Sequence, residues 1–272
     1  MASLKDKVIF ITGATRGIGR EIALHAAKEG AILIITGKTE QPHRILPGTI
    51  HTVANEVIAA GGQALPILLD VREDEQIHAA VDKVVERYGR IDVLINNASA
   101  IQLTRTEETP MRRFDLMYEV NVRATFACAQ ACIPFLKKAA NPHILTLSPP
   151  LNLDPKWFRN HVAYTISKYG MSMCTLGWAE ELAAYGIAVN SLWPRTTIDT
   201  SAMNHFPKAV RQASRHPDIM AEAAVCILKQ PAKTLTGQFL IDEAVLASIG
   251  GVTDFSRYAL NPEMALYDDL FL

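Results

Sequence analysis

The feature that most constrains the fold of this chain is a glycine-rich turn near its N-terminus. The apolar run Val8–Thr12 leads into Thr12-Gly13-Ala14-Thr15-Arg16-Gly17-Ile18-Gly19, and a helical pattern follows over 17–29. A strand, a glycine turn and a helix in this order are typical of a dinucleotide-binding βαβ unit, because glycine lets the backbone turn tightly and approach a pyrophosphate. The N–H groups and positive dipole end of the helix favour the same phosphates. We therefore expect phosphate contacts from Gly13, Thr15, Arg16, Gly17, Ile18 and Gly19.

Apolar runs and amphipathic stretches alternate along the rest of the chain. Short runs rich in Val, Ile and Leu predict strands over 8–12, 31–36, 64–70, 91–96, 143–148, 187–193 and 238–242. Helical patterns fall at 17–29, 50–60, 73–88, 111–138, 161–184 and 217–229. This alternation predicts one α/β domain over 1–272, a doubly wound Rossmann-type parallel sheet of about seven strands with helices on both faces. The irregular segment 194–217 is expected to be a substrate lid.

The end of the second predicted strand distinguishes between the two nicotinamide dinucleotides. NAD enzymes usually place an acid there to hold the ribose 2′-hydroxyl. This chain has Lys38 at that place, and the first acid is Glu40. Lys38 and the planar fork of Arg16 would attract a 2′-phosphate. NADP(H) is therefore predicted, with NAD(H) bound through Glu40 as the alternative.

A tyrosine and a lysine stand one helical turn apart in the pattern 161–184. Tyr164 and Lys168 share a helix face, and a nearby ammonium lowers the pKa of a phenol. Ser148 ends the preceding predicted strand, where a hydroxyl can donate to a substrate oxygen as charge develops. We interpret Tyr164, Lys168 and Ser148 as an acid/base site for carbonyl or alcohol chemistry, the alternative for Ser148 being a polar residue at a strand end.

Composition excludes several other classes of protein. The net charge is −1, without a basic stripe, so no nucleic-acid partner is expected. No ligand spacing among the histidines predicts a catalytic metal. The helical pair Cys128 and Cys132 is read as buried core. The chain shows no secretory leader and no membrane span, and the cysteine usage suits a reducing compartment, so we expect a cytoplasmic location.

Taken together, these motifs resemble the short-chain dehydrogenase/reductase family. The resemblance is carried by TGATRGIG (12–19), Asp70, NNAS (96–99), Asn121, Ser148 and YTISK (164–168), in the family's order over nearly the whole chain. Further stretches, among them TPMRRFDLMYEVNVRATF, ILTLSPPLNLDPKWF and FLIDE, are similar to the hydroxysteroid dehydrogenase-like protein 2 group. That group often carries a C-terminal sterol-carrier domain, for which the printed sequence shows no counterpart.

The resemblance implies roles for individual residues. Tyr164 would donate or accept the proton, and Lys168 would also hold the nicotinamide ribose. Asn121 would hold a water that links Lys168 to solvent, and an asparagine within a helix is unfavourable and often bends it. An exposed helical asparagine is the alternative. Asp70 would contact the adenine, and the 96–99 segment with Asn97 would support the cofactor. Pro194 would contact the cofactor before the lid, although Pro194-Arg195 replaces the usual Pro-Gly.

The expected substrate is an apolar carbonyl or alcohol, such as a steroid or lipid-like ketone, and the expected assembly is a homo-oligomer, most often a tetramer by resemblance. His161 is predicted to be a surface residue rather than a pocket residue. Trp193, Met203 and Phe206 form either an apolar substrate wall or packing for the lid. A non-catalytic dinucleotide-binding scaffold and a 3-ketoacyl-thioester reductase, with Arg195 or Lys208 at the pocket mouth, are the alternative functions.

Overall fold

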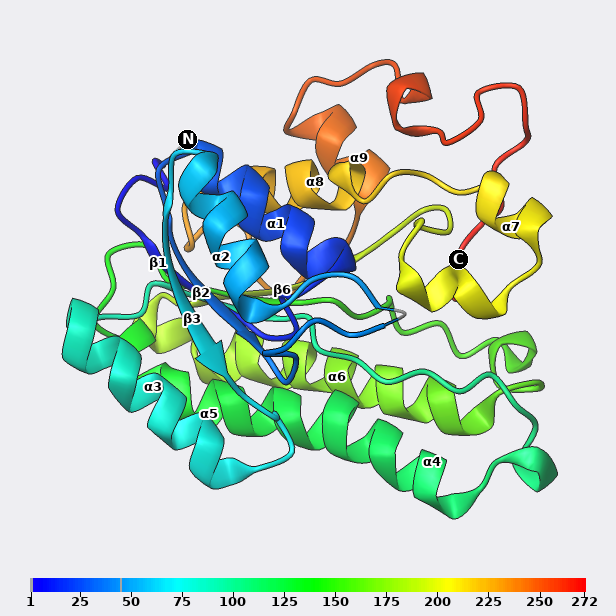
Figure 1. Cartoon of the computed structure of the whole chain (residues 1–272), viewed down its shortest axis with the longest axis horizontal. Coiled ribbons are helices and arrows are strands. Elements are labelled where there is room, and N and C mark those ends of the chain that lie inside the picture. The colour runs from blue at the N-terminus through cyan, green and yellow to red at the C-terminus, as the bar shows by residue number, and fades with distance from the viewer. Residues whose placement is uncertain (1, 45) are drawn as a thin grey trace.

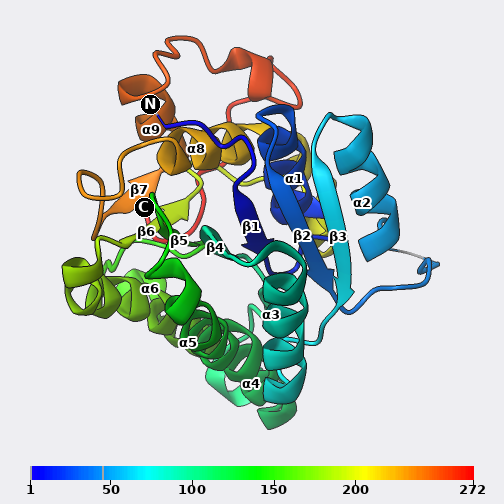
Figure 2. The ribbon, with the colours of Figure 1, turned by 90° about the vertical axis from the view of Figure 1, so that its left-hand side faces the viewer.

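Seven parallel strands form a single sheet in the order β3-β2-β1-β4-β5-β6-β7 (Figure 2). The structure is a computed structural model that describes residues 2–44 and 46–272. The strands are β1 (Val8–Ile11), β2 (Ile32–Gly37), β3 (Gln63–Leu68), β4 (Val93–Asn96), β5 (His143–Thr146), β6 (Ala188–Trp193) and β7 (Phe239–Ile241). The strand order reverses between β1 and β4. This is the switch point at which doubly wound sheets bind their ligands, beyond the carboxyl ends of the strands.

Helices cover both faces of the sheet (Figure 1). One face carries α1 (Gly17–Lys28), α2 (Ile50–Ala59), α8 (Asp218–Leu228) and α9 (Asp242–Ser248). The other carries α3 (Asp74–Tyr88), α5 (Ala124–Leu136) and α6 (Val162–Glu181), with α4 (Met111–Met117) leading into α5. The predicted doubly wound fold and its seven strands are confirmed. The short helices α7 (Lys208–Gln212) and α9 were not predicted.

The alternation of side chains along β1 explains the two hydrophobic cores. Ile9 and Ile11 point into the core under α1, α2 and α8, whereas Val8 and Phe10 point into the core under α3, α5 and α6. All four side chains are fully buried. Continuous apolar strands arise in this way, because a parallel sheet is covered on both faces. Cys128 and Cys132 lie buried in the second core, as predicted, and burial raises the pKa of the Cys128 thiol to about 12.

The long helical pattern 111–138 is interrupted in its middle. A π-helical turn, η2 (Tyr118–Arg123), separates α4 from α5 and contains Asn121, which is completely buried. Such turns are rare and are frequent at functional sites. The sequence predicted the bend at this asparagine, and the alternative of an exposed helical residue is wrong. The 3₁₀ turns are η1 (Thr106–Glu108), η3 (Pro155–Trp157), η4 (Ala183–Tyr185), η5 (Ser201–His205) and η6 (Ser256–Tyr258).

The segment after α9 runs back across the molecule to the carboxyl edge of the sheet (Figure 1). It makes isolated bridges between Thr196 and Asp268 and between Arg215 and Ala259, so it covers the 194–217 segment. No secondary structure was predicted beyond residue 250. Among the described residues, no helix combines the length and the apolar character that a membrane crossing would need.

Candidate active site

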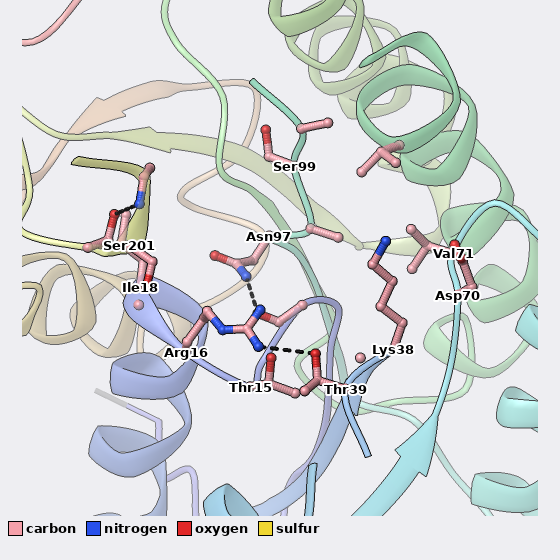
Figure 3. Close-up of a pocket in the computed structure, with 18 of the residues that line it drawn as sticks. Thr15, Arg16, Ile18, Lys38, Thr39, Asp70, Val71, Asn97, Ser99 and Ser201 are labelled. Carbon is pink, nitrogen blue, oxygen red and sulfur yellow. Dashed lines mark hydrogen bonds between the residues drawn. The ribbon is translucent and has the colours of Figure 1, made fainter. Parts of the chain in front are cut away.

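A cavity of about 370 Å³ opens at the carboxyl ends of β1, β2 and β4 (Figure 3). Eight of the predicted cofactor residues line it: Gly13, Thr15, Arg16, Gly17, Ile18, Lys38, Asp70 and Asn97. Thr39 also lines it and was not predicted, whereas Ser99 belongs to the 96–99 segment that the resemblance assigns to the cofactor, and residues 200–202 belong to the expected lid. Gly19, Lys168 and Pro194 do not line it. The cavity therefore brings together the glycine turn, the end of β2 and residues 200–202 of the 194–217 segment.

The glycine turn has the backbone that a pyrophosphate requires. Gly13 and Gly17 have positive φ angles of +66° and +57°, and a Cβ on Gly13 would lie 2.9 Å from the Cα of Ala98. A Cβ on Gly19 would lie 2.4 Å from Asn97 Nδ2, so Gly19 allows close packing instead of lining the cavity. No side chain caps the N-terminus of α1. Its first N–H groups are therefore available for an anion, and the residues present fit a dinucleotide phosphate.

Two cations lie at the part of the cavity formed by the end of β2. The Arg16 guanidinium donates to Thr39 Oγ1 at 3.0 Å (Figure 3). It also donates to Pro47 O at 3.0 Å, so it is held beside the β2 end. The ammonium of Lys38 has no hydrogen bond within the described part of the chain and is exposed. Glu40 does not line the cavity, and its carboxylate lies 3.7 Å from His51 Nε2. The local charge is thus positive, which suits an additional phosphate.

Asp70 carries a partner that the sequence did not reveal. Arg72 donates to both carboxylate oxygens, at 3.0 Å from Nε and 2.6 Å from Nη2. These hydrogen bonds lower the pKa of Asp70. The carboxylate is therefore oriented before any ligand binds, with Lys38 as a further nearby cation.

Hydrogen bonds between β1 and β4 hold the floor of the cavity. Thr12 Oγ1 accepts from the backbone N–H groups of Asn97 and Ala98, both at 3.0 Å. The Asn97 amide donates to the carbonyls of Thr12 and Gly13, both at 2.9 Å. Asn97 therefore fixes the glycine turn against the end of β4, which is a supporting role like the predicted one.

Helix α6 brings Lys168 to the end of β5. The Lys168 ammonium, which is 2% exposed, donates to Leu147 O at 2.6 Å, and Ser172 Oγ one turn later donates to Pro149 O at 2.6 Å. Both contacts flank Ser148 in the chain. Burial lowers the pKa of Lys168 to about 7, and the negative charge of Asp269 opposes that shift.

Tyr164 lies one turn before Lys168 on α6 and is 6% exposed. Both side chains face the same apolar cluster, since Tyr164 packs with Trp193 and the Lys168 ammonium lies 5.1 Å from the Trp193 ring centroid. The pKa of Tyr164 is shifted in the opposite direction from the one that the sequence predicted. Burial raises the pKa of Tyr164, Asp269 raises it further, and the ammonium that should lower it is bound to Leu147.

Ser148 and Asn121 are both buried and hydrogen-bonded within the protein. Ser148 Oγ lies 2.8 Å from Ser191 Oγ, which donates to Thr175 Oγ1 at 2.8 Å. The Asn121 amide donates to Ser167 Oγ at 2.9 Å and accepts from Ala100 N at 2.7 Å. Asn121 thus connects the π-helical turn to α6 and to the segment after β4. The four predicted catalytic residues therefore lie on elements that are packed together at the carboxyl edge of the sheet.

An aromatic enclosure, which we define as Trp157, His161, Tyr164, Tyr169 and Trp193, surrounds the side chain of Phe271. The prediction that His161 is a surface residue is wrong. His161 is 8% exposed, its Nδ1 lies 2.9 Å from Thr165 Oγ1, and burial lowers its pKa. His161 directly precedes α6 and packs against Phe271. Because Phe271 is more than a hundred residues away in the chain, no local sequence pattern could reveal this contact.

The family follows from the sequence. The pattern of the family described as short chain dehydrogenase matches residues 7–210, and the chain belongs to this family of oxidoreductases. The chain is 57% identical over 265 residues to hydroxysteroid dehydrogenase-like protein 2 of Bos taurus. The aligned residues make up 97% of this chain and 63% of the bovine protein. The chain thus spans less than two thirds of the length of that relative.

Solved structures with the same fold include close and distant relatives. A putative dehydrogenase from Xanthomonas campestris is 53% identical, with a TM-score of 0.97 over 99% of both chains. A metagenomic short-chain oxidoreductase in complex with NADP is 26% identical, with a TM-score of 0.73 over 88% of this chain and 98% of the other. These proteins share the fold of this chain.

Proposed function

We propose that this chain is an NADP(H)-dependent oxidoreductase that interconverts a carbonyl and an alcohol on an apolar substrate. The observation that carries the proposal is the attachment of α6 to the end of β5. The buried ammonium of Lys168 is bound beside Ser148, and the phenol of Tyr164 lies one turn away in the same apolar cluster. Buried acid/base groups at a ligand-binding edge are more typical of catalysis than of a scaffold.

Each residue has a role in this proposal. A bound NADP(H) would supply or accept the hydride. Tyr164 transfers the proton to or from the substrate oxygen, and the Ser148 hydroxyl donates to that oxygen after leaving Ser191. Lys168, released from Leu147, holds the nicotinamide ribose and lowers the pKa of the phenol. Asn121 keeps the π-helical turn in place, where a water connects Lys168 to solvent.

The preference for NADP(H) is supported by the charges at the end of β2. Lys38 makes no hydrogen bond within the described residues and Arg16 is oriented beside Thr39, while Glu40 lies outside the cavity. An exposed phosphate held by an Arg fork and a Lys gains charge-assisted hydrogen bonds that a ribose hydroxyl does not. The distant relative that contains NADP is consistent with this preference.

The apolar substrate is supported by the side chains around Tyr164. Trp157, Tyr169 and Trp193 offer large apolar surfaces and few hydrogen-bonding groups. Of the two roles predicted for Trp193, this apolar environment favours a substrate wall over packing for the lid. Met203 is buried within the 194–217 segment. The name of the bovine relative points to the same class of substrate. A thioester carrier is less supported, because Arg195 lies 3.7 Å from Asp268 and is thereby paired.

A homo-oligomer in the cytoplasm also remains a proposal. Phe126, Met173 and Leu176 are 51%, 57% and 54% exposed. They lie on α5 and α6, the helices expected to form subunit contacts. These exposed apolar side chains support subunit contacts through the two helices.

A substrate panel tests the proposed function. Purified protein is incubated with NADPH or NADH and with steroid ketones, aldehydes or 3-ketoacyl thioesters, and loss of reduced-cofactor absorbance is followed. We expect turnover with NADPH and apolar ketones. Turnover only with thioesters would establish the alternative enzyme. Binding of NADPH without turnover of any compound would favour the scaffold.

A further inference from the structure

The last described residues, Tyr267–Leu272, lie against the proposed substrate site; we call them the 267–272 segment. Its backbone is held on both sides of the site. Thr197 N donates to Tyr267 O at 2.9 Å, and Asp269 N donates to Arg195 O at 3.2 Å. The Trp193 indole donates to Leu270 O at 2.9 Å. The segment is therefore attached to the residues that follow β6, which include the predicted lid.

The side chain of Phe271 fills the aromatic enclosure. It is 1% exposed, and its ring centroid lies 5.3 Å from that of Tyr169, 5.9 Å from that of Trp193 and 6.3 Å from that of Tyr164. The phenol that should meet a substrate thus has a phenylalanine ring of its own chain as a neighbour. Tyr164 is consequently buried and does not line the open cavity.

The backbone of Phe271 is in an unfavourable conformation. Its φ angle is +78°, a left-handed value that a bulky residue adopts only when its surroundings require it. The ring is thus well packed while the main chain at the same residue is strained. This combination suits a segment that can leave its site, because departure relieves the strain while a ligand of similar shape replaces the packing.

A half-buried carboxylate enters the site with the ring. Asp269 is close enough to act electrostatically on both Tyr164 and Lys168, and its Oδ1 accepts from Leu270 N at 2.7 Å. A negative charge here disfavours the phenolate. The 267–272 segment therefore blocks the site and also opposes the ionisation that alcohol oxidation needs.

We propose that the 267–272 segment is a displaceable plug of the substrate site, in which the Phe271 ring occupies the place of an apolar ring of the substrate. The identity of the occupant as a ketone or alcohol rests on the proposed function. The plug would restrict entry to substrates whose apolar group can replace a phenyl ring between Trp193 and Tyr169. Such a site would select flat or cyclic apolar carbonyl compounds over short polar ones.

Binding of androstenedione, a flat ketone, tests the plug without any turnover. The variants are Phe271→Ala and, as the matched control, Tyr267→Ala, which removes an aromatic side chain of the same segment that is 56% exposed. Binding is followed by indole fluorescence, and NADPH binding is measured separately. We expect Phe271→Ala to bind the ketone at least about tenfold more tightly than the wild type, because the site no longer has to expel a ring. Tyr267→Ala should bind it like the wild type, and the NADPH affinity should stay constant throughout.

Hydrogen exchange of the wild-type protein provides a test that requires no variant. The amide of Asp269, bonded to Arg195 O, should exchange faster when the ketone binds. Unchanged protection of this amide with bound ketone would overturn the plug, as would equal or weaker ketone binding by Phe271→Ala. Tighter binding without turnover by any variant would leave the plug standing and remove the proposed oxidoreductase function. Turnover by the wild type together with weaker ketone binding by Phe271→Ala would support the proposed oxidoreductase function and overturn the plug.

Discussion

The two ends of the candidate site are built differently. The cofactor end is an open cavity of about 370 Å³ whose wall combines the glycine turn and the charged side chains of Arg16, Lys38 and Asp70 with aliphatic side chains. The substrate end is closed, and its wall is aromatic side chains packed around Phe271. One end is therefore ready for its ligand, whereas the other has to rearrange.

This difference shows which properties of the site depend on neighbours along the chain. The phosphate-binding part of the cofactor end depends on a turn, a strand end and a helix start that are contiguous, so its geometry forms together with the βαβ unit, while Asn97 and residues 200–202 complete the cavity from distant parts of the chain. The substrate end joins the segments around residues 157, 164, 193 and 271. Its shape depends on long-range packing, which can have more than one arrangement. We expect cofactor affinity and turnover to respond to separate substitutions.

The largest effect is expected from Tyr164→Phe. Loss of the phenol oxygen should lower kcat by about 100- to 10,000-fold, because positioned acid/base groups contribute factors of this size. NADPH affinity should be unchanged, since Tyr164 does not line the cavity. Stopped-flow turnover and equilibrium cofactor titration measure the two quantities. Retained turnover would show that another group transfers the proton, and a parallel loss of NADPH binding would show that the two ends are one unit.

A smaller effect is expected from Lys38→Asp at the cofactor end. Replacing a cation with an anion beside the 2′-phosphate should weaken NADPH binding by roughly 10- to 100-fold. The reason is that one charge-assisted hydrogen bond is lost and the new carboxylate repels the phosphate. NADH binding should change little. Titration of both dinucleotides checks this, with Lys28→Asp on the far end of α1 as the control for net charge. An equal effect on both dinucleotides would contradict the assignment of Lys38 to the 2′-phosphate.

The sequence predicted which residues of the glycine turn and of the β2 end lie together because their arrangement is local. The glycine turn, Lys38 and Asn97 were assigned to the place where the structure has them, and the bend at Asn121 followed from the cost of an asparagine within a helix. The partner of Asp70 was missed, although Arg72 is only two residues away, because a surface pair of this kind leaves no periodic signal.

Most of the substrate end could not be predicted. His161 was expected at the surface because the pattern 161–184 shows only which face of a helix is apolar, and Phe271 belongs to a segment without periodicity. The rotamer of Lys168 was also beyond the sequence. Its position one turn from Tyr164 is fixed by the helix, but its bond to Leu147 depends on where β5 ends. The sequence did show a charged residue, Asp269, next to apolar residues that include Phe271. It did not indicate which residues these two side chains contact.

The smallest effect compares two aspartates, one at each end, through the pH dependence of stability. Burial raises the pKa of Asp269 to about 7 from 3.8, so its folded form holds a proton more tightly than the unfolded chain. The contribution of Asp269 to the free energy of unfolding is fully present below about pH 4 and is lost as the pH rises through about 7. Asp242, with its pKa raised to about 6, and Lys168, lowered to about 7, titrate nearby and remain as background.

Asp269→Asn should therefore flatten the fall in unfolding free energy between pH 4 and 7, by the order of 2 kcal/mol, as measured by urea denaturation. Asp70→Asn is the matched control with the opposite sign. Arg72 lowers the pKa of Asp70, so that contribution is present above about pH 4 and is lost only in more acid solution. Its variant should differ from the wild type by a constant offset between pH 4 and 7. If Asp269→Asn also gave only a constant offset, the carboxylate would be solvated in solution and the substrate end would already be open without a ligand.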